Sequence, residues 1–206
     1  MSHYFDESPA AASAAATVRV DVPGASFTLR TDRGVFSHGR LDAGTEILLR
    51  SAPAPSASGH LLDLGCGAGA IALTLARRAP AATVWAVDVN ERARHLCATN
   101  ARDNGLDNVR VAAPDEIPPD VRFGTIWSNP PIRIGKPALH ELLRTWLAHL
   151  TPDGEALLVV HKHLGSDSLQ RWLVGEGWPT ERLTSAKGYR VLRVTNRKPA
   201  AWDATR

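Results

Sequence analysis

The stretch "LLDLGCGAGAIAL", residues 61–73, passes from a short apolar run into a helix-like run through three glycines. Gly65, Gly67 and Gly69 stand directly after the apolar run, where a strand would end and a helix would begin. Glycine tolerates positive φ and lets the main chain approach a ligand closely. The stretch therefore predicts a strand, a ligand-binding loop and a helix, although a tight strand-to-helix turn without a ligand is an open alternative.

Strands and helices alternate along the chain on both sides of this loop. Predicted strands occupy 60–64, 83–88, 109–113, 123–128 and 156–161, and predicted helices occupy about 69–79, 91–103, 137–150 and 166–175. Such alternation indicates an α/β fold with a parallel sheet covered by helices on both faces. Segments 180–185 and 188–196 are expected to add an antiparallel hairpin. We expect a mostly parallel seven-stranded sheet.

The residues before the alternating region predict an N-terminal β-hairpin extension. Segments 17–22 and 26–31 alternate apolar and polar residues around the turn signal "PGA", and 44–51 resembles a short helix. A chain of 206 residues with 44% apolar residues suits one domain. We therefore divide a single domain, 1–206, into a flexible arm (1–16), a hairpin, helix and loop (17–59), a catalytic core (60–195) and a tail (196–206).

Charge and cysteine content narrow the class of protein. The formal net charge is only +3, which is not a strong electrostatic footprint for nucleic acid but leaves room for a local basic patch. Cys66 and Cys97 lack metal-ligand spacing, so we expect a reduced compartment and no metal site. No signal peptide is evident and no apolar stretch approaches a membrane span of ~18 residues, so a cytoplasmic protein is expected.

Acidic residues follow the predicted strands at one edge of the sheet. The predicted strand 83–88 ends within "WAVDVN", which puts Asp88 at its carboxyl end, nineteen residues after Gly69. There its carboxylate can accept both hydrogens of a ribose diol. A dinucleotide fits less well, because the glycine spacing is unusual and Asp63 would face a pyrophosphate. S-Adenosylmethionine, which carries an ammonium and a sulfonium, suits Asp63 better. Asp115 can accept from an adenine amino group, or can form an Asx turn after Pro114.

The stretch "SNPPIRIGK", residues 128–136, ends another predicted strand with Asn129, Pro130 and Pro131. Proline fixes φ and restricts the residue before it, so this turn is rigid. On its own it is also a common way to leave a sheet. For His38, His161 and His163 we expect ordinary structural or solvated roles.

Five motifs occur in a fixed order: "GVFSHGRLDAGTEILL", "LLDLGCGAGAIAL", "VDVNERA", "SNPPIRIGK" and "KGYRVL". On these motifs the chain resembles the small-domain family of class I methyltransferases, from about His3 to Thr195. It is most similar to short members related to the catalytic half of ribosomal RNA guanine-N2 methyltransferases. The resemblance implies a Rossmann-like fold and an S-adenosylmethionine-dependent N-methyltransferase.

The resemblance also implies roles for individual residues. Residues expected to bind the cofactor are Asp63, Gly65, Cys66, Gly67 and Gly69 at its methionine end, Asp88 at the ribose, Val89 and Asp115 at the adenine, and Asn129. The substrate amine is expected to meet Asn129, Pro130, Pro131 and Ile132. Acceptors on Asn129 and Pro130 would take the hydrogens of a planar NH₂ and aim its lone pair at the methyl group.

The chain departs from many amine methyltransferases at Ile132, where an aromatic residue usually stacks on the target base. Phe36 is expected to supply that contact, or aliphatic packing replaces it. Arg40, Arg133 and Lys136 are expected to contact RNA phosphates, with a merely solvated charged rim as the alternative.

The predicted function is methylation of a guanine exocyclic N2 amine in ribosomal RNA, within an assembling particle. Two alternatives are open: methylation of a protein glutamine amide or a small-molecule amine, and a catalytically weak RNA-binding assembly factor. We expect RNA as the partner and a monomer or small homo-oligomer.

Overall fold

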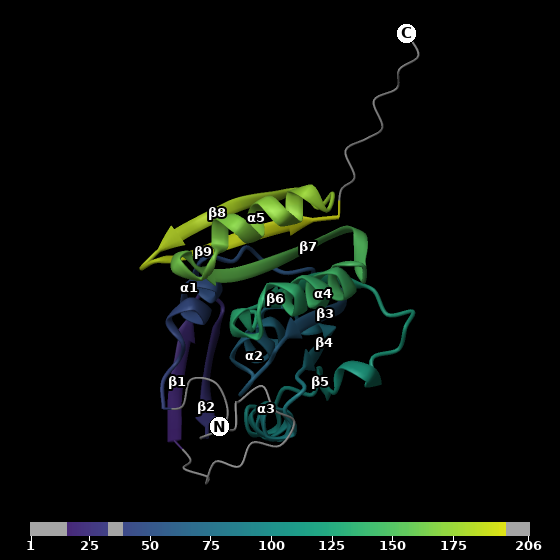
Figure 1. The fold of residues 1–206 in the computed structure, drawn as a ribbon. Helices are drawn as coiled ribbons and strands as arrows, with labels where there is room; N and C mark the ends of the chain where they lie inside the picture. Colours follow the sequence, from purple (N-terminus) through teal and green to yellow (C-terminus); the bar gives the residue numbers. More distant parts are fainter. Residues whose placement is uncertain (1–15, 33–38, 197–206) are drawn as a thin grey trace.

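A computed structural model describes residues 16–32 and 39–196. Its main feature is a seven-stranded sheet with the order β5-β4-β3-β6-β7-β9-β8. The strands are β3 (Ser58–Leu64), β4 (Ala81–Val87), β5 (Val109–Ala112), β6 (Phe123–Ser128), β7 (Leu150–His161), β8 (Thr180–Ala186) and β9 (Tyr189–Thr195). The first five strands are parallel, whereas β9 runs antiparallel to both β7 and β8. The predicted mostly parallel, seven-stranded sheet is confirmed (Figure 1).

The strand boundaries agree with the predicted ones except in β7. That strand begins at Leu150 rather than at residue 156. Residues 151–155 are threonine, proline, aspartate, glycine and glutamate, so the apolar run starts only at Ala156. Gly154 also lies against the carbonyl of Phe123, where a Cβ would approach to 2.8 Å, and the register between β6 and β7 shifts at this point. The irregular start of the strand therefore left no alternating signal in the sequence.

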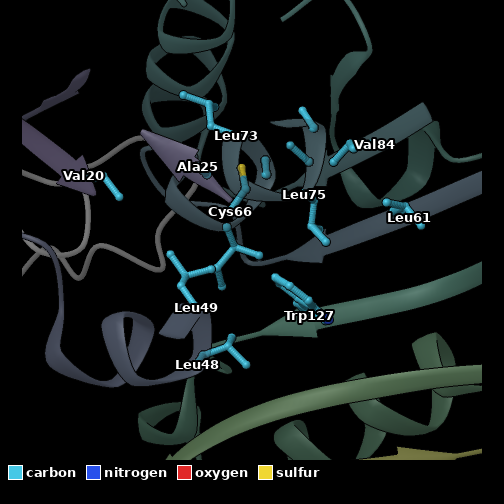
Figure 2. Close-up of a cluster of buried hydrophobic side chains, with 14 of the residues drawn as sticks. Val20, Ala25, Leu48, Leu49, Leu61, Cys66, Leu73, Leu75, Val84 and Trp127 are labelled. Atoms are coloured by element: carbon cyan, nitrogen blue, oxygen red, sulfur yellow. The ribbon is translucent and has the colours of Figure 1, made fainter. Parts of the chain in front are cut away.

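Helices cover both faces of the sheet, and each face has its own core (Figure 1). One core packs under α1 (Ala43–Ser51), α2 (Ala70–Arg78) and α3 (Glu91–Asp103), with the fully buried Trp127 near its centre (Figure 2). The other packs under α4 (Lys136–Leu147) and α5 (Ser166–Gly175). Successive residues of β3 alternate between the cores, since Leu61 joins the first and Leu62 the second. Burial on both faces explains why these strands read as continuous apolar runs.

A separate two-stranded sheet, β1 (Ala16–Val22) and β2 (Ala25–Thr31), forms the predicted N-terminal hairpin. Asn100 of α3 and Asn104, the C-cap of that helix, bind the edge of β2. The Asn100 amide accepts from Arg30 N at 2.8 Å and donates to Arg30 O at 2.9 Å, and Asn104 makes the same pair of bonds with Thr28. Asn100 also donates to the carbonyl of Ala68 in the glycine loop, at 2.8 Å. These side chains replace a third strand and fix the hairpin beside the loop.

Short 3₁₀ turns follow several strands at their carboxyl ends. They are η1 (Pro114–Glu116), η2 (Ile132–Ile134) and η3 (Lys162–Leu164). Within the described ranges, no helix has both the length and the apolar character that a membrane span requires.

Candidate active site

A cavity of about 680 Å³ opens at the carboxyl ends of β3, β4, β6 and β7. Its wall comes from the loops after these strands, the start of α1, and Tyr189 at the start of β9. From β3 the chain passes outward to β4 and β5 and then returns to β6 on the other side of β3, so the strand order reverses here. Such a switch point is where ligands of open α/β sheets bind. Most predicted site residues line it: Arg40, Gly65, Cys66, Gly67, Asp88, Val89, Asn129, Pro130, Pro131, Ile132 and Arg133.

The glycines of the loop after β3 serve different purposes. Gly65 has a φ of +79°, and a Cβ there would meet no atom within 4 Å, so the main chain faces open space beside the cavity. Gly69 has a φ of +97°, but its Cβ would lie 2.7 Å from the sulfur of Cys97. Gly65 therefore leaves room for a ligand, whereas Gly69 lies off the cavity wall and allows α2 to pack closely on α3.

Asp88 lies on the cavity wall with both carboxylate oxygens held in place. One oxygen accepts from Gly67 N and the other from Asn90 N, each at 2.9 Å. Burial raises the pKa of this carboxyl, while the hydrogen bonds from Asn90 and Gly67 oppose the rise. Each carboxylate oxygen has a further lone pair. The side chain can therefore receive two more hydrogens from a ligand without moving.

Asp63 occupies a different position from the one expected. It is fully buried, does not line the cavity, and accepts from Ala72 N in α2 at 2.8 Å. Its second oxygen has no hydrogen-bond partner among the described residues. Burial is the main reason that its pKa rises to about 8. The carboxyl thus supports the start of α2 from beneath the glycine loop, in largely protonated form at neutral pH.

Asn129 has its amide orientation fixed by Thr45 of α1 and by Asp42, the N-cap of that helix. Its Nδ2 donates to Asp42 Oδ2 at 2.8 Å and to Thr45 Oγ1 at 3.1 Å. Asp42 Oδ2 also accepts from Thr45 N at 2.9 Å and so caps the helix. Both amide hydrogens are used, and among residues 16–32 and 39–196 no donor reaches Asn129 Oδ1. The side chain therefore presents an oriented acceptor in the cavity wall.

The two prolines form a tighter turn than expected. Pro131 has φ −75° and ψ 71°, and Ile132 N donates to the carbonyl of Pro130 at 2.8 Å, as in an inverse γ-turn. The Pro130 carbonyl is therefore not free of neighbouring donors, although one lone pair remains. This turn fixes the direction of that carbonyl relative to Asn129.

Other predicted residues lie off the cavity wall. Asp115, in η1, and Lys136, at the start of α4, are exposed and do not line the cavity, although their neighbours Pro114 and Arg133 do. Phe36 and His38 lie outside the described residues.

Sequence reasoning missed several residues of the wall. His161 and His163 were expected to have ordinary roles, yet both line the cavity, as do Asp42, Thr45 and Tyr189. The spacing of Asp42 and Thr45 is a recognisable N-cap signal. It gives no hint, however, of the contact with Asn129, which is 87 residues away from Asp42.

The family model for the methyltransferase small domain matches residues 26–193. The uncharacterized protein YbxB of Bacillus subtilis is 34% identical over 195 residues, which cover 93% of this chain and 97% of that protein. Ribosomal RNA small subunit methyltransferase C of Pseudomonas aeruginosa is 37% identical over 162 residues, covering 77% of this chain and 48% of the relative. The chain thus spans nearly all of the first relative and about half of the second.

Among solved structures, the T. thermophilus 16S rRNA N2 G1207 methyltransferase (RsmC), in complex with AdoMet and guanosine, is similar with a TM-score of 0.74 and 26% identity. The match covers 89% of this chain and 51% of that one. A ribosomal protein L11 methylase of Lactobacillus delbrueckii, at 20% identity and a TM-score of 0.63, shares the fold.

Proposed function

The chain belongs to the methyltransferase small-domain family and is an S-adenosylmethionine-dependent methyltransferase, and we propose that it methylates the exocyclic N2 amine of a guanine in ribosomal RNA. The observation that carries the proposal is the fixed amide of Asn129. With both hydrogens bound by Asp42 and Thr45, the amide offers only an acceptor to the cavity. An acceptor suits an NH₂ donor. We place this activity in the cytoplasm, beside the assembling ribosome.

Asn129 Oδ1 and the remaining lone pair of the Pro130 carbonyl would each accept one hydrogen of the guanine amine. Holding both hydrogens draws the nitrogen lone pair out of conjugation with the ring and directs it at the methyl donor. Because the inverse γ-turn and the α1 contacts fix the two acceptors, little reorganisation is needed on binding. Alignment of this kind can supply roughly 7–11 kcal/mol.

S-Adenosylmethionine supplies a methyl group bonded to a sulfonium. With the cofactor bound, the amine nitrogen would form the new N–C bond as the S–C bond broke, the electron pair would stay on sulfur, and the extra proton would leave the nitrogen for solvent. Asp88 would hold the ribose hydroxyls through the lone pairs that Gly67 and Asn90 leave unused. The open space above Gly65 fits the close approach of a cofactor to the main chain.

Ile132 would pack its aliphatic side chain against the target base, where an aromatic ring would stack. Stacking on an aromatic residue is worth about 1–3 kcal/mol per base, so the remaining affinity must come from elsewhere. A base paired inside a helix cannot reach the carboxyl edge of a sheet. The target is therefore a single-stranded, bulged or flipped guanine.

The decisive experiment maps modified nucleosides in ribosomal RNA from a strain that lacks the protein. We expect one N2-methylguanine to disappear and to return with the wild-type gene. Asn129→Ala should not restore it, because loss of one oriented polar group in a transition state costs about 100- to 1,000-fold in turnover. An unchanged RNA methylation pattern, together with transfer of labelled methyl groups to protein or to a free amine, would overturn the proposal.

A further inference from the structure

Basic residues gather around the mouth of the cavity. Segments 39–45, 130–136, 161–164 and 186–189 surround or adjoin it, and their charged residues are Arg40, Asp42, Arg133, Lys136, Lys162 and Lys187. Five cations and one carboxylate give these segments a formal charge of +4, whereas the whole chain carries +3. The rest of the chain is therefore slightly acidic in sum. The cavity wall itself carries two cations, Arg40 and Arg133, and two carboxylates, Asp42 and Asp88, so the excess positive charge lies beside the wall, on Lys136, Lys162 and Lys187.

One of these cations, Lys187, has an unfavourable backbone conformation. Lys187 and Gly188 form the two-residue turn between β8 and β9, with φ values of +47° and +82°. Lys187 is the one non-glycine residue with positive φ in the described part of the chain. Turns with positive φ at both positions favour asparagine, aspartate or glycine. A lysine there brings a charge to the tip of the turn at the expense of backbone preference.

The turn is attached to the cavity wall. Lys162 N, in η3, donates to the carbonyl of Gly188 at 2.8 Å. A Cβ on Gly188 would lie 3.0 Å from His161 Nε2, so the turn has no space to move closer. The His161 ring in turn meets the ring of Tyr189 edge-on at 4.8 Å. Lys162 and Lys187 are therefore held on one wall, next to two residues that line the cavity.

The two lysines also differ from the arginines of the same hairpin in their pairing. Arg182 and Arg190 bind Asp167, and Arg193 binds Glu155 and Glu181. Lys162 and Lys187 are exposed, and within 16–32 and 39–196 neither reaches a carboxylate. Their charges are thus available to a ligand outside the cavity.

We infer that Lys162 and Lys187 form a phosphate-binding wall for single-stranded RNA, separate from the predicted contacts at Arg40, Arg133 and Lys136. The inference rests on the proposed function and adds how the strand is held. A nucleotide whose base enters the cavity leaves its flanking phosphates at the mouth. The strand would lie between η2 and the β8–β9 turn, with cations on both sides, which explains how a chain of low net charge positions RNA.

The test uses Lys187→Asn and Lys162→Ala, singly and together, with Arg110→Ala as the control. Arg110 is exposed on β5, the edge strand at the other side of the sheet. Its replacement by alanine changes the net charge by the same amount as either single lysine variant. Binding of a fluorescent single-stranded oligoribonucleotide is titrated over a series of potassium chloride concentrations. Each lost phosphate contact should flatten the log–log salt slope by about 0.7, so the double variant should lose about 1.4 and Arg110→Ala nothing.

The unfolding temperature distinguishes the loss of a phosphate contact from damage to the fold. Asparagine tolerates the left-handed region, so Lys187→Asn should unfold at an equal or higher temperature while it binds RNA more weakly. Affinity for S-adenosylmethionine should be unchanged. If wild-type protein methylates RNA and the double variant shows the same salt slope and the same methylation rate, phosphate binding by Lys162 and Lys187 is refuted, while the proposed function is not. If wild-type protein methylates no RNA, the proposed function and this inference both fall.

Discussion

Replacement of Thr45 by valine tests whether the orientation of the Asn129 amide controls methyl transfer. Valine keeps the shape of threonine but removes the hydroxyl that accepts from Asn129 Nδ2 at 3.1 Å. Thr45 is only 7% exposed, and valine offers no acceptor in place of the hydroxyl. The bond that Asn129 Nδ2 donates to Asp42 Oδ2 remains, and so does the helix cap in which Thr45 N donates to the same oxygen. The amide is then held by one contact instead of two.

The expected loss follows from the two bonds. A neutral hydrogen bond contributes about 0.5–1.5 kcal/mol, which corresponds to a roughly 2- to 13-fold lower kcat for Thr45→Val. The bond to the Asp42 carboxylate is charge-assisted and contributes about 1.5–3 kcal/mol. Asp42→Ser, which still caps α1 but no longer reaches Asn129, should therefore lose roughly 10- to 160-fold. Thr45→Ser keeps the hydroxyl and should retain nearly normal turnover.

Single-turnover methylation at saturating RNA and cofactor measures this effect, with calorimetric titration of S-adenosylmethionine as the control. The rate should fall in the order Thr45→Ser, Thr45→Val, Asp42→Ser, and cofactor affinity should stay constant across the series. A normal rate for Thr45→Val would show that the hydroxyl is not needed, and a loss for Thr45→Ser as large as that for Thr45→Val would show that packing of the threonine methyl matters as much as the hydroxyl. A normal rate for Asp42→Ser would show that the fixed orientation of the Asn129 amide plays no part in methyl transfer.

Three further outcomes are expected. Asp88→Ala should weaken S-adenosylmethionine binding more than tenfold in calorimetry, because two charge-assisted hydrogen bonds of about 1.5–3 kcal/mol each are lost; an unchanged Kd would remove the cofactor assignment. Asp63 has a pKa of about 8 in the fold against an ordinary 3.8, so the folded state holds its proton more tightly. The contribution of Asp63 to stability should therefore be fully present below about pH 4 and be lost as pH rises from about 4 to about 8, by up to about 1.4 kcal/mol per pH unit, and urea unfolding of Asp63→Asn should lack this component. Asn100→Ala should lower the free energy of unfolding in urea by roughly 1–3 kcal/mol, since it leaves the main-chain groups of Arg30 and Ala68 without these hydrogen bonds.

Local patterns in the sequence were sufficient for the sheet and for most of the cavity wall. The apolar runs before Gly65, Asp88 and Asn129 gave the strands, and the carboxyl ends of parallel strands necessarily meet at one edge. These residues could therefore be brought together without coordinates.

What the sequence could not predict depends on contacts between distant segments. In the sequence, Asn100 looks like an ordinary polar residue of a helix. Its hydrogen bonds with the main chain of Arg30 form only because the hairpin packs against that helix. Asp63 was expected beside a ligand because it is acidic and next to the loop. The surrounding elements bury the Asp63 side chain, so its burial could not be predicted from the spacing of the motif. The position of His161 on the wall likewise follows from the full length of β7 and its pairing with Tyr189.

The reversal of direction at β9 has an evolutionary consequence. Because β9 runs antiparallel to β7 and pairs Tyr189 with His161, the connection from β8 arrives at the same edge of the sheet as the cavity. That connection contains only two residues and belongs to neither core. Insertions at residues 187–188 would therefore reshape the entrance without disturbing the packed layers. This turn is the position at which we expect relatives, or a protein engineer, to change which substrate enters.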